Sequence, residues 1–159
     1  MDKSYCSDED YNLWWLILQM RRFMYRVREK ELFKYGVTPE EAGLLFVVNA
    51  IGHKATPAEI SRWLVRQPQS TSGLVTRMER KGLVRRVKDL GRKDMVRVAI
   101  TTKGQQLYRL ASKRESIHRI MTALSGNERR RLQPCLLKLR DKALKELGIM
   151  QVPPFPTSR

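Results

Sequence analysis

The chain has 159 residues, of which 42% are hydrophobic and 30% are charged. This composition predicts a single folded domain and argues against a disordered chain. Lysine and arginine outnumber aspartate and glutamate by 32 to 16, so the formal net charge is +16. A charge of this size indicates a polyanionic partner, with nucleic acid the first candidate and an anionic membrane surface the second.

The positive charge is concentrated in the middle of the chain. From Arg62 to Arg97, eleven basic side chains stand against three acidic ones, which gives a net charge of +8 over 36 residues. Residues 101–159 carry thirteen basic and four acidic side chains, a net charge of +9 over a longer stretch. The middle segment is therefore the first place to look for a polyanion site, whereas the basic C-terminal third is also typical of a solvated helix face.

Helix starts are marked by a hydroxyl residue three positions before a glutamate. The segments are "TPEE" at 38–41, "TPAE" at 56–59 and "SGNE" at 125–128. In this capping box, the hydroxyl and the glutamate each satisfy a backbone N–H that the helix leaves unpaired. Together with the apolar spacing, these signals predict helices over residues 10–33, 39–49, 57–64 and 68–81. Gly82 suits the left-handed residue that ends the fourth helix.

The sequence pattern changes after Gly82. The segments "LVRRVK" and "VRVAI" alternate in polarity and flank the turn-forming segment "DLGRKDM", which predicts a β-hairpin. A fifth helix should begin after Thr101, and a sixth should cover residues 127–147. Residues 151–159 contain three prolines and should form an extended tail. A lone hairpin is unstable in water, so we expect it to pack against the helices.

The helices at 57–64 and 68–81 form a candidate helix-turn-helix, because only three residues join them. The second helix keeps a thin apolar edge of Leu74, Val75 and Met78, which suffices to dock it on a scaffold. In such a motif the second helix enters the DNA major groove, where small polar side chains meet base edges and basic ones meet phosphates. The predicted DNA-binding residues are Arg62, Arg66, Gln67, Gln69, Ser70, Thr71, Ser72, Thr76, Arg77, Lys81, Arg92 and Lys93. Of these, Arg92 and Lys93 lie at the hairpin tip, where they can enter the minor groove.

The segments "TPAEISRWL", "STSGLVTRMERKGLVRR" and "DLGRKDMVRVAITTKG" resemble those of MarR-type transcriptional regulators. The usual family string is close to L-E-x-x-G-L-[VI]-x-R, with Met78 here in place of the leucine. It is followed by an acidic and arginine-rich wing and by [LI]-T-x-x-G, matched here by Ile100, Thr101 and Gly104. The wing of the family usually reads acidic-x-arginine directly before the second strand, whereas this chain reads Arg92–Lys93–Asp94. The resemblance therefore assigns the role of the wing arginine to Arg92. Gly73 stands where the family often has a larger, basic residue.

The resemblance implies a mainly α fold with a small β-hairpin wing, an α+β winged helix-turn-helix with N- and C-terminal dimerisation helices. It divides a single domain of residues 1–159 into a dimerisation lobe of residues 1–37 and 102–150 and a DNA-binding lobe of residues 38–101. The aromatic and aliphatic side chains near the N-terminus are too many for one small core, which also favours a partner surface. The predicted dimerisation residues are Leu13, Trp14, Ile17, Leu132, Leu136 and Leu139.

The sequence shows no nucleophile–base pair, carboxylate dyad, phosphate-binding glycine loop or metal-ligand cluster, so we expect neither an enzyme nor a cofactor or metal site. Cys6 and Cys135 have no metal or disulfide spacing. We interpret Cys6 as an inert thiol rather than a redox sensor, and Cys135 as part of the core. The run from Leu13 to Leu18 is far shorter than the ~20 residues that cross a bilayer. With no secretory leader, a cytoplasmic location is expected.

These observations predict a homodimeric, sequence-specific regulator of transcription that binds double-stranded DNA, more specifically a repressor. Two-fold symmetry would place two identical helices about one DNA turn apart on a pseudo-palindromic operator. The family resemblance further implies control by a small ligand, whose identity the sequence leaves open. Two alternatives remain: a sequence-tolerant architectural DNA-binding protein, for which the net charge alone would suffice, and a winged-helix module that binds proteins only.

Overall fold

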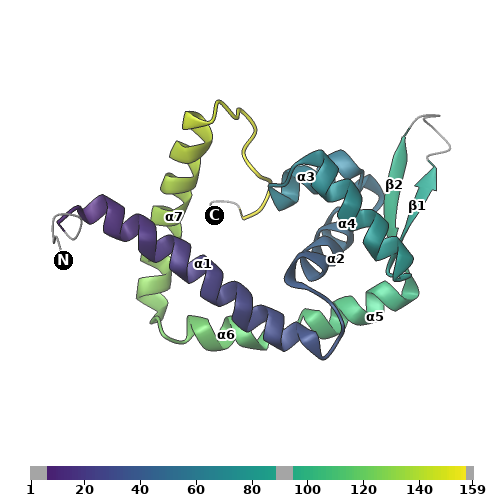
Figure 1. Cartoon of the computed structure of the whole chain (residues 1–159), viewed down its shortest axis with the longest axis horizontal. Helices are drawn as coiled ribbons and strands as arrows, with labels where there is room; N and C mark the ends of the chain where they lie inside the picture. The colour runs from purple at the N-terminus through teal and green to yellow at the C-terminus, as the bar shows by residue number, and fades with distance from the viewer. Residues whose placement is uncertain (1–6, 89–94, 157–159) are drawn as a thin grey trace, which may run out of the picture.

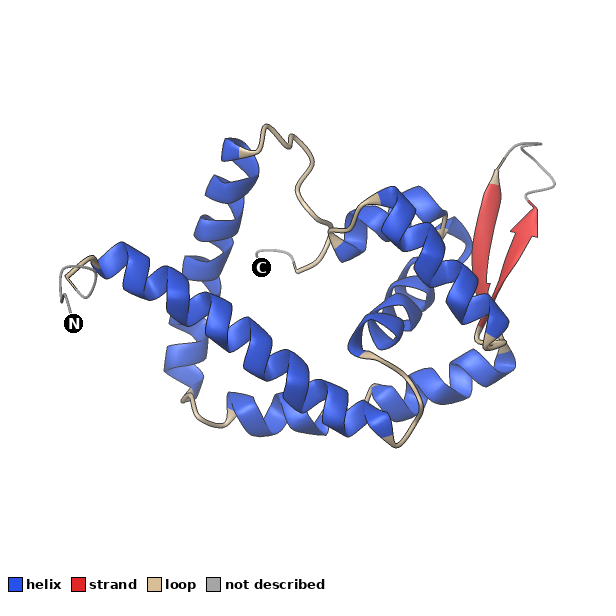
Figure 2. Cartoon of the chain, in the orientation of Figure 1, coloured by secondary structure: helices blue, strands red, loops and turns tan. Residues whose placement is uncertain are grey.

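A computed structural model describes residues 7–88 and 95–156 of the chain. Within them the fold is mainly helical with one two-stranded antiparallel hairpin, as the sequence predicts (Figures 1 and 2). The elements are α1 (Glu9–Phe33), α2 (Pro39–Ile51), the 3₁₀ turn η2 (Gly52–Lys54), α3 (Pro57–Leu64), α4 (Pro68–Arg80), β1 (Val84–Lys88), β2 (Val96–Ile100), α5 (Thr102–Ala111), α6 (Glu115–Met121) and α7 (Gly126–Glu146).

The hydrophobic core lies around α2 in the winged lobe, the name used below for residues 38–101. Leu44, Leu45, Val47 and Val48 of α2 are almost completely buried, because helices α3 and α4, the hairpin and α5 cover this helix from several sides. The hairpin packs on this core through Val84 and Val98, and the two strands pair with Val84 opposite Ile100. The hairpin is therefore supported by the helices, as expected for an isolated pair of strands.

Two of the three predicted capping boxes form completely. Thr38 and Glu41 exchange hydrogen bonds at the start of α2, and Ser125 and Glu128 do the same at the start of α7. At α3 only half of the box forms: the Thr56 hydroxyl accepts from the amide of Glu59. The Glu59 carboxylate instead pairs with Arg62 one turn later. The basic residue three positions ahead thus competes with the helix start for this glutamate.

An additional helix, α6, corrects the prediction of only two helices after Thr101. Helix α5 ends at Ala111, and Arg114 adopts a left-handed conformation with φ of 51° before α6 begins. No side chain of α6 caps its own N-terminus. The carboxylate of Glu31 on α1 does so instead, by accepting from the amides of Glu115 at 3.0 Å and Ser116 at 3.2 Å. Contacts far apart in the sequence therefore define this helix.

Glu31 is the central polar group between α1 and α6. It accepts hydrogen bonds from the Ser116 hydroxyl and from the guanidinium of Arg28, which also donates to the carbonyl of Ala111 at 2.6 Å. Burial alone would raise the pKa of the Glu31 carboxyl, but the hydrogen bonds from Ser116 and Arg28 outweigh it and lower the pKa to about 2. The carboxylate is therefore held ionised between the two helices.

Helices α1 and α7 expose apolar side chains along their lengths. The exposed fractions are 51% for Leu13, 57% for Trp14, 38% for Ile17, 41% for Leu132, 47% for Leu136 and 49% for Leu139. Cys135, which we predicted to lie in the core, is also exposed, because the apolar side of α7 on which it lies faces away from the rest of this chain. An exposed apolar surface of this extent is typical of an interface with another molecule.

The segment after α7 contains neither helix nor strand up to residue 156 and returns to the winged lobe (Figure 2). Pro153 is buried there. The ring of Phe155 lies 5.3 Å from that of Phe46 on α2 and 6.3 Å from that of Trp63 on α3, measured between centroids. Arg140 of α7 donates a hydrogen bond of 2.9 Å to the carbonyl of Pro156. The tail thus connects α7 to the first two helices of the winged lobe.

Candidate nucleic-acid interface

Helices α3 and α4 are joined by the short turn of residues 65–67, as the sequence predicts. Val65 ends α3 in the left-handed region, with φ of 51°, and its amide donates to carbonyls of the last turn of α3. The amide of Arg66 then donates to the carbonyl of Ser61 at 3.0 Å. A β-branched residue rarely adopts this conformation, so the surrounding packing must hold the turn. The two helices are thereby fixed in a helix-turn-helix arrangement.

Helix α4 has one buried and one exposed side. Thr71, Leu74, Val75 and Met78 are buried, at spacings of three and four residues that place them on one side of the helix. The opposite side forms a shallow surface, which we call the reading face; it consists of Gln69, Ser72, Gly73, Thr76, Arg77 and Arg80. Four of the predicted DNA-binding residues lie on this face, and Ser70 is exposed beside it.

The prediction that Thr71 contacts DNA is wrong, although it was made for every polar residue in the first turns of α4. Its side chain has 0% exposed surface, and its hydroxyl has no hydrogen-bond partner among the described residues. A side chain buried in this way cannot reach a base edge while α4 stays docked. Conversely, Gly73 and Arg80 belong to the reading face and were missed. Arg80 could have been predicted, because it follows Thr76 by four residues and therefore lies on the same side of the helix.

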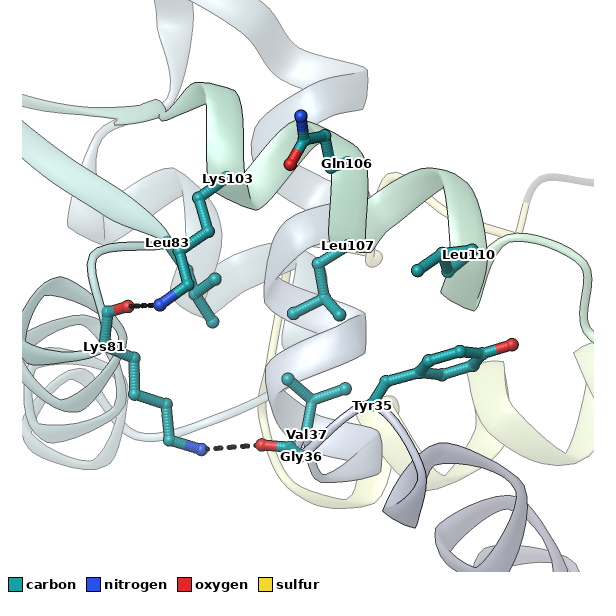
Figure 3. A pocket seen from close by; sticks show the side chains of 9 residues that line it. All are labelled: Tyr35, Gly36, Val37, Lys81, Leu83, Lys103, Gln106, Leu107 and Leu110. Atoms are coloured by element: carbon teal, nitrogen blue, oxygen red, sulfur yellow. Dashed lines mark hydrogen bonds between the residues drawn. The ribbon is translucent and has the colours of Figure 1, made fainter.

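Lys81 lies on the scaffold side of α4, which corrects its predicted contact with a phosphate. Figure 3 shows its ammonium directed at the connection between α1 and α2, where Nζ donates to the carbonyl of Gly36 at 3.1 Å. Nζ also donates to the carboxylate of Glu41 at 2.8 Å. Nearby, Nζ of Lys103 donates to the carbonyl of Lys81 at 2.9 Å, and both residues line a cavity of about 440 Å³ (Figure 3). The Lys81 ammonium thus ties the end of α4 to α2 and to the connection before it, and the Lys103 ammonium ties α5 to the end of α4.

Three further predicted DNA-binding residues, Arg62, Arg66 and Gln67, differ in their surroundings. Arg62 is exposed but paired with Glu59 on its own helix. Arg66 is partly buried, and its Nε has no hydrogen-bond partner in the part of the chain that the structure describes. Gln67 is exposed at the N-cap of α4 and makes no side-chain capping bond. These three residues surround the start of α4, next to the reading face.

The hairpin is attached to α4 through Arg86 of β1. The Glu79 carboxylate accepts hydrogen bonds from the amide of Arg86 at 2.9 Å and from its guanidinium, which also donates to the Thr76 hydroxyl at 3.0 Å. The backbone hydrogen bond from Arg86 lowers the pKa of the Glu79 carboxyl, and the guanidinium lowers it further. The hairpin therefore has a fixed orientation relative to the reading face. Arg92 and Lys93 at the predicted tip, and Cys6, lie outside the described residues.

A second cavity, of about 460 Å³, lies between the two lobes. Its wall combines apolar side chains with two arginines; the residues are Arg28, Pro39, Ala42, Gly43, Phe46, Tyr108, Ala111, Ser112, Arg114, Ile117 and Phe155. The guanidinium of Arg114 lies over the ring of Phe46, 5.5 Å from its centroid. Aromatic, aliphatic and cationic groups around one hollow suit a small aromatic molecule that carries negative charge.

Neither a metal-ion site nor a membrane-spanning helix occurs in the described residues. Across 7–88 and 95–156, no three histidine, cysteine, aspartate or glutamate side chains are grouped so that they could hold a metal ion. In the same residues, no helix combines the length and the apolar character that crossing a membrane requires.

Comparison with known proteins relates the chain to one family of regulators. Residues 35–93, which include the helix-turn-helix and the first strand of the hairpin, match the model of the MarR family. No curated protein matches the chain in sequence. Among solved structures, the organohalide-sensing transcriptional regulator RdhR-CbdbA1625, in its 2,4-dichlorophenol-bound form, is 26% identical with a TM-score of 0.86; the match covers 99% of this chain and 96% of that one.

Two further structures are complexes with DNA. MepR of S. aureus bound to DNA is 22% identical with a TM-score of 0.75, and the match covers 80% of this chain and 96% of that one. A mutant of MarR from E. coli bound to operator DNA is 21% identical with a TM-score of 0.76, with coverage of 82% and 95%. At these identities the likeness concerns the fold: a MarR-type winged helix with flanking helices.

Proposed function

We propose that this MarR-type winged-helix protein is a sequence-specific, double-stranded DNA-binding regulator of transcription, and that it represses the promoter it covers. One observation carries the proposal: α4 exposes a polar and cationic face while its other side is buried in the core. A helix exposed in this way can enter a major groove without unfolding its support. The DNA-bound relatives of the same fold are consistent with this use of the helix.

The contacts divide into two groups by chemistry. Gln69, Ser70, Ser72 and Thr76 carry amide or hydroxyl groups, which hydrogen-bond to base edges and provide sequence preference. The flanking groups bind the backbone; we assign this role to Arg62, Arg66, Gln67, Arg77 and Arg80, with Arg92 and Lys93 of the wing placed in the minor groove. Thr71 and Lys81 are left out, because they face the core and the scaffold.

The proposed regulator acts as a homodimer. The exposed apolar side chains of α1 and α7 supply a self-complementary surface, because the two-fold axis of a dimer brings the same helices of both protomers together. Such a dimer presents two copies of α4 to one side of a duplex. The operator should then be pseudo-palindromic, with half-sites about 10 base pairs apart from centre to centre. Binding to chromosomal DNA would place the protein in the cytoplasm.

A small ligand in the cavity between the lobes is the proposed control. The relative that is 26% identical was solved with 2,4-dichlorophenol, an aromatic molecule, and the cavity here offers Phe46 and Arg114 to such a group. A ligand changes DNA affinity only if it binds one arrangement of the lobes more tightly than another. The cavity is suited to this because α1, α2, α5 and α6 all contribute to its wall.

Selection from a random duplex library, followed by titration across salt, tests the function. A specific regulator should enrich one pseudo-palindromic duplex and prefer it to a scrambled duplex by about 10³-fold or more at physiological salt. An architectural protein would bind both duplexes alike and lose both together as salt rises. A protein-binding module would bind neither, and replacing Arg77 and Arg80 with alanine would then change nothing.

A further inference from the structure

Glu41, at the third position of α2, is a carboxylate with 0% exposed surface directly behind the recognition helix α4. A buried carboxylate is stable only where hydrogen bonds and opposite charges compensate for the lost water. One oxygen, Oε2, is fully compensated: it accepts from the amide of Thr38 at 3.0 Å and from Nζ of Lys81 at 2.8 Å. The capping box and the hydrogen bond from Lys81 therefore compensate one of the two carboxylate oxygens.

The other oxygen, Oε1, faces Arg77 of α4. Its nearest cationic atom is Nε of Arg77, at 3.4 Å, and no described residue donates a hydrogen bond to it. Arg77 is nevertheless 56% exposed and belongs to the reading face. The carboxylate therefore approaches the guanidinium from the Nε side. The two terminal nitrogens, which are the ones that grip a phosphate in a bidentate manner, remain available to the outside.

We propose that Glu41 is a positioning residue for DNA binding, which acts by fixing the guanidinium of Arg77 so that its terminal nitrogens meet a DNA phosphate. The inference rests on the proposed function and adds to it a residue that never touches DNA. A free arginine side chain has many rotamers, so a guanidinium already held in place loses less conformational entropy on binding. The free protein thus holds the arginine before the duplex arrives.

The effect of removing this charge has opposite signs under the two possible roles. As a mere negative charge near the interface, Glu41 would repel phosphates, and its neutralisation would strengthen DNA binding. As the group that positions Arg77, it supports a phosphate contact, and its neutralisation weakens binding. Glutamine is the suitable replacement, because the capping box accepts glutamine as well as glutamate.

The experiment measures the affinity of four variants for the duplex that the wild-type protein enriches: E41Q, R77A, the double variant, and E128Q. Glu128 is a matched control, since it is the capping-box glutamate of α7 and pairs with Ser125 in the dimerisation lobe. Far-ultraviolet circular dichroism and thermal melting establish that each variant is folded at the temperature of the titration. A variant that melts early is titrated at lower temperature beside the wild type.

We expect E41Q and R77A each to weaken binding about fivefold and the double variant to be no weaker than R77A alone, because the two residues act through one contact. R77A should also lower the salt slope by about 1, and E41Q should do so in part. E128Q should leave affinity unchanged. Unchanged or tighter binding by E41Q, or additive losses in the double variant, would overturn the role of Glu41 while leaving the DNA-binding function intact. Failure of the wild-type protein to enrich any duplex would overturn both.

Discussion

Phe155 in the C-terminal tail stacks on Trp63 in α3, with the two ring planes only 9° apart. The same ring also contacts Phe46 of α2, so one residue of the tail packs against both α2 and α3. Because Arg140 on α7 donates a hydrogen bond to the carbonyl of Pro156, the tail joins α7 to the helix-turn-helix. The tail is thus part of the fold of the winged lobe rather than an appendage.

Replacing Phe155 with alanine should therefore destabilise the protein by about 1–2 kcal/mol, since each aromatic pair contributes on the order of 1 kcal/mol beyond its buried area. Urea unfolding at a fixed protomer concentration measures this free energy, because a dimer's stability depends on concentration. Met150, 95% exposed in the same tail, supplies the control. Equal stability of the Phe155→Ala and Met150→Ala variants would show that the tail does not stabilise the winged lobe.

The ionised Glu31 carboxyl should make stability depend on pH in the acid range. Its folded-state pKa is about 2 against an ordinary value of 4.5, so the carboxylate stabilises the fold above about pH 4.5, and this contribution is lost as the pH falls towards 2. In urea unfolding, Glu31→Gln should be less stable than the wild type at pH 5 by about 2–3 kcal/mol and similar to it at pH 2. Glu29→Gln, which removes an exposed carboxyl of α1, is the control for the loss of one surface charge. A constant difference between Glu31→Gln and the wild type would contradict the ion-pair account.

A charge on the exposed apolar side of α1 should break the dimer. Ile17→Glu would place an ionised group in a dehydrated interface, which should raise the dimer dissociation constant by about 100-fold or more. Sedimentation velocity across protein concentration measures the change. Val87→Glu is matched to it, because Val87 on β1 has the same exposed fraction of 38% but lies in the winged lobe. If Ile17→Glu and Val87→Glu dimerise equally well, the interface lies elsewhere.

Two glycines should respond to alanine in opposite ways. A Cβ atom at Gly104 would lie 2.0 Å from the carbonyl oxygen of Leu83, so the backbone of α5 would have to move away from the residue that precedes β1, at a cost of about 2 kcal/mol or more. At Gly73, on the reading face, a Cβ atom meets nothing within 4 Å, and alanine should stabilise α4 by up to about 1 kcal/mol. Thermal unfolding of both variants tests the pair. A Gly104→Ala variant that melts like the wild type would be inconsistent with this packing.

Local signals predicted most of the helix boundaries. The hydroxyl–proline start at Thr56 and Pro57 placed α3 at the residues that the structure shows, because capping is decided within a few neighbouring residues. Helix α6 was not predicted, since its cap comes from Glu31, more than eighty residues earlier in the chain. The outward side of α7 was misassigned at Cys135, because an apolar stripe has the same spacing whether it meets the core or a second protomer.

The errors within the candidate interface have a different origin. Thr71 and Lys81 were assigned to DNA by residue type, whereas the helical period links both to the buried residues Leu74 and Met78. The side of the helix on which a residue lies therefore decides whether it can reach DNA, whatever its chemical type. The same helical period places Arg80 on the reading face. The support that Glu41 gives to Arg77 could not be predicted, because it depends on how α2 and α4 cross rather than on any local pattern.

Hydroxyl-radical footprinting of the full-length protein on its enriched duplex tests the central claim most directly. Two copies of α4 on one side of the DNA should protect two segments whose centres lie about 10 base pairs apart, with symmetrical patterns on the two strands. If the single substitution Arg77→Ala weakens the protection of both segments together, both segments are contacted by α4. One continuous protected stretch, or equal protection of a scrambled duplex, would contradict the account of a symmetric, sequence-specific regulator.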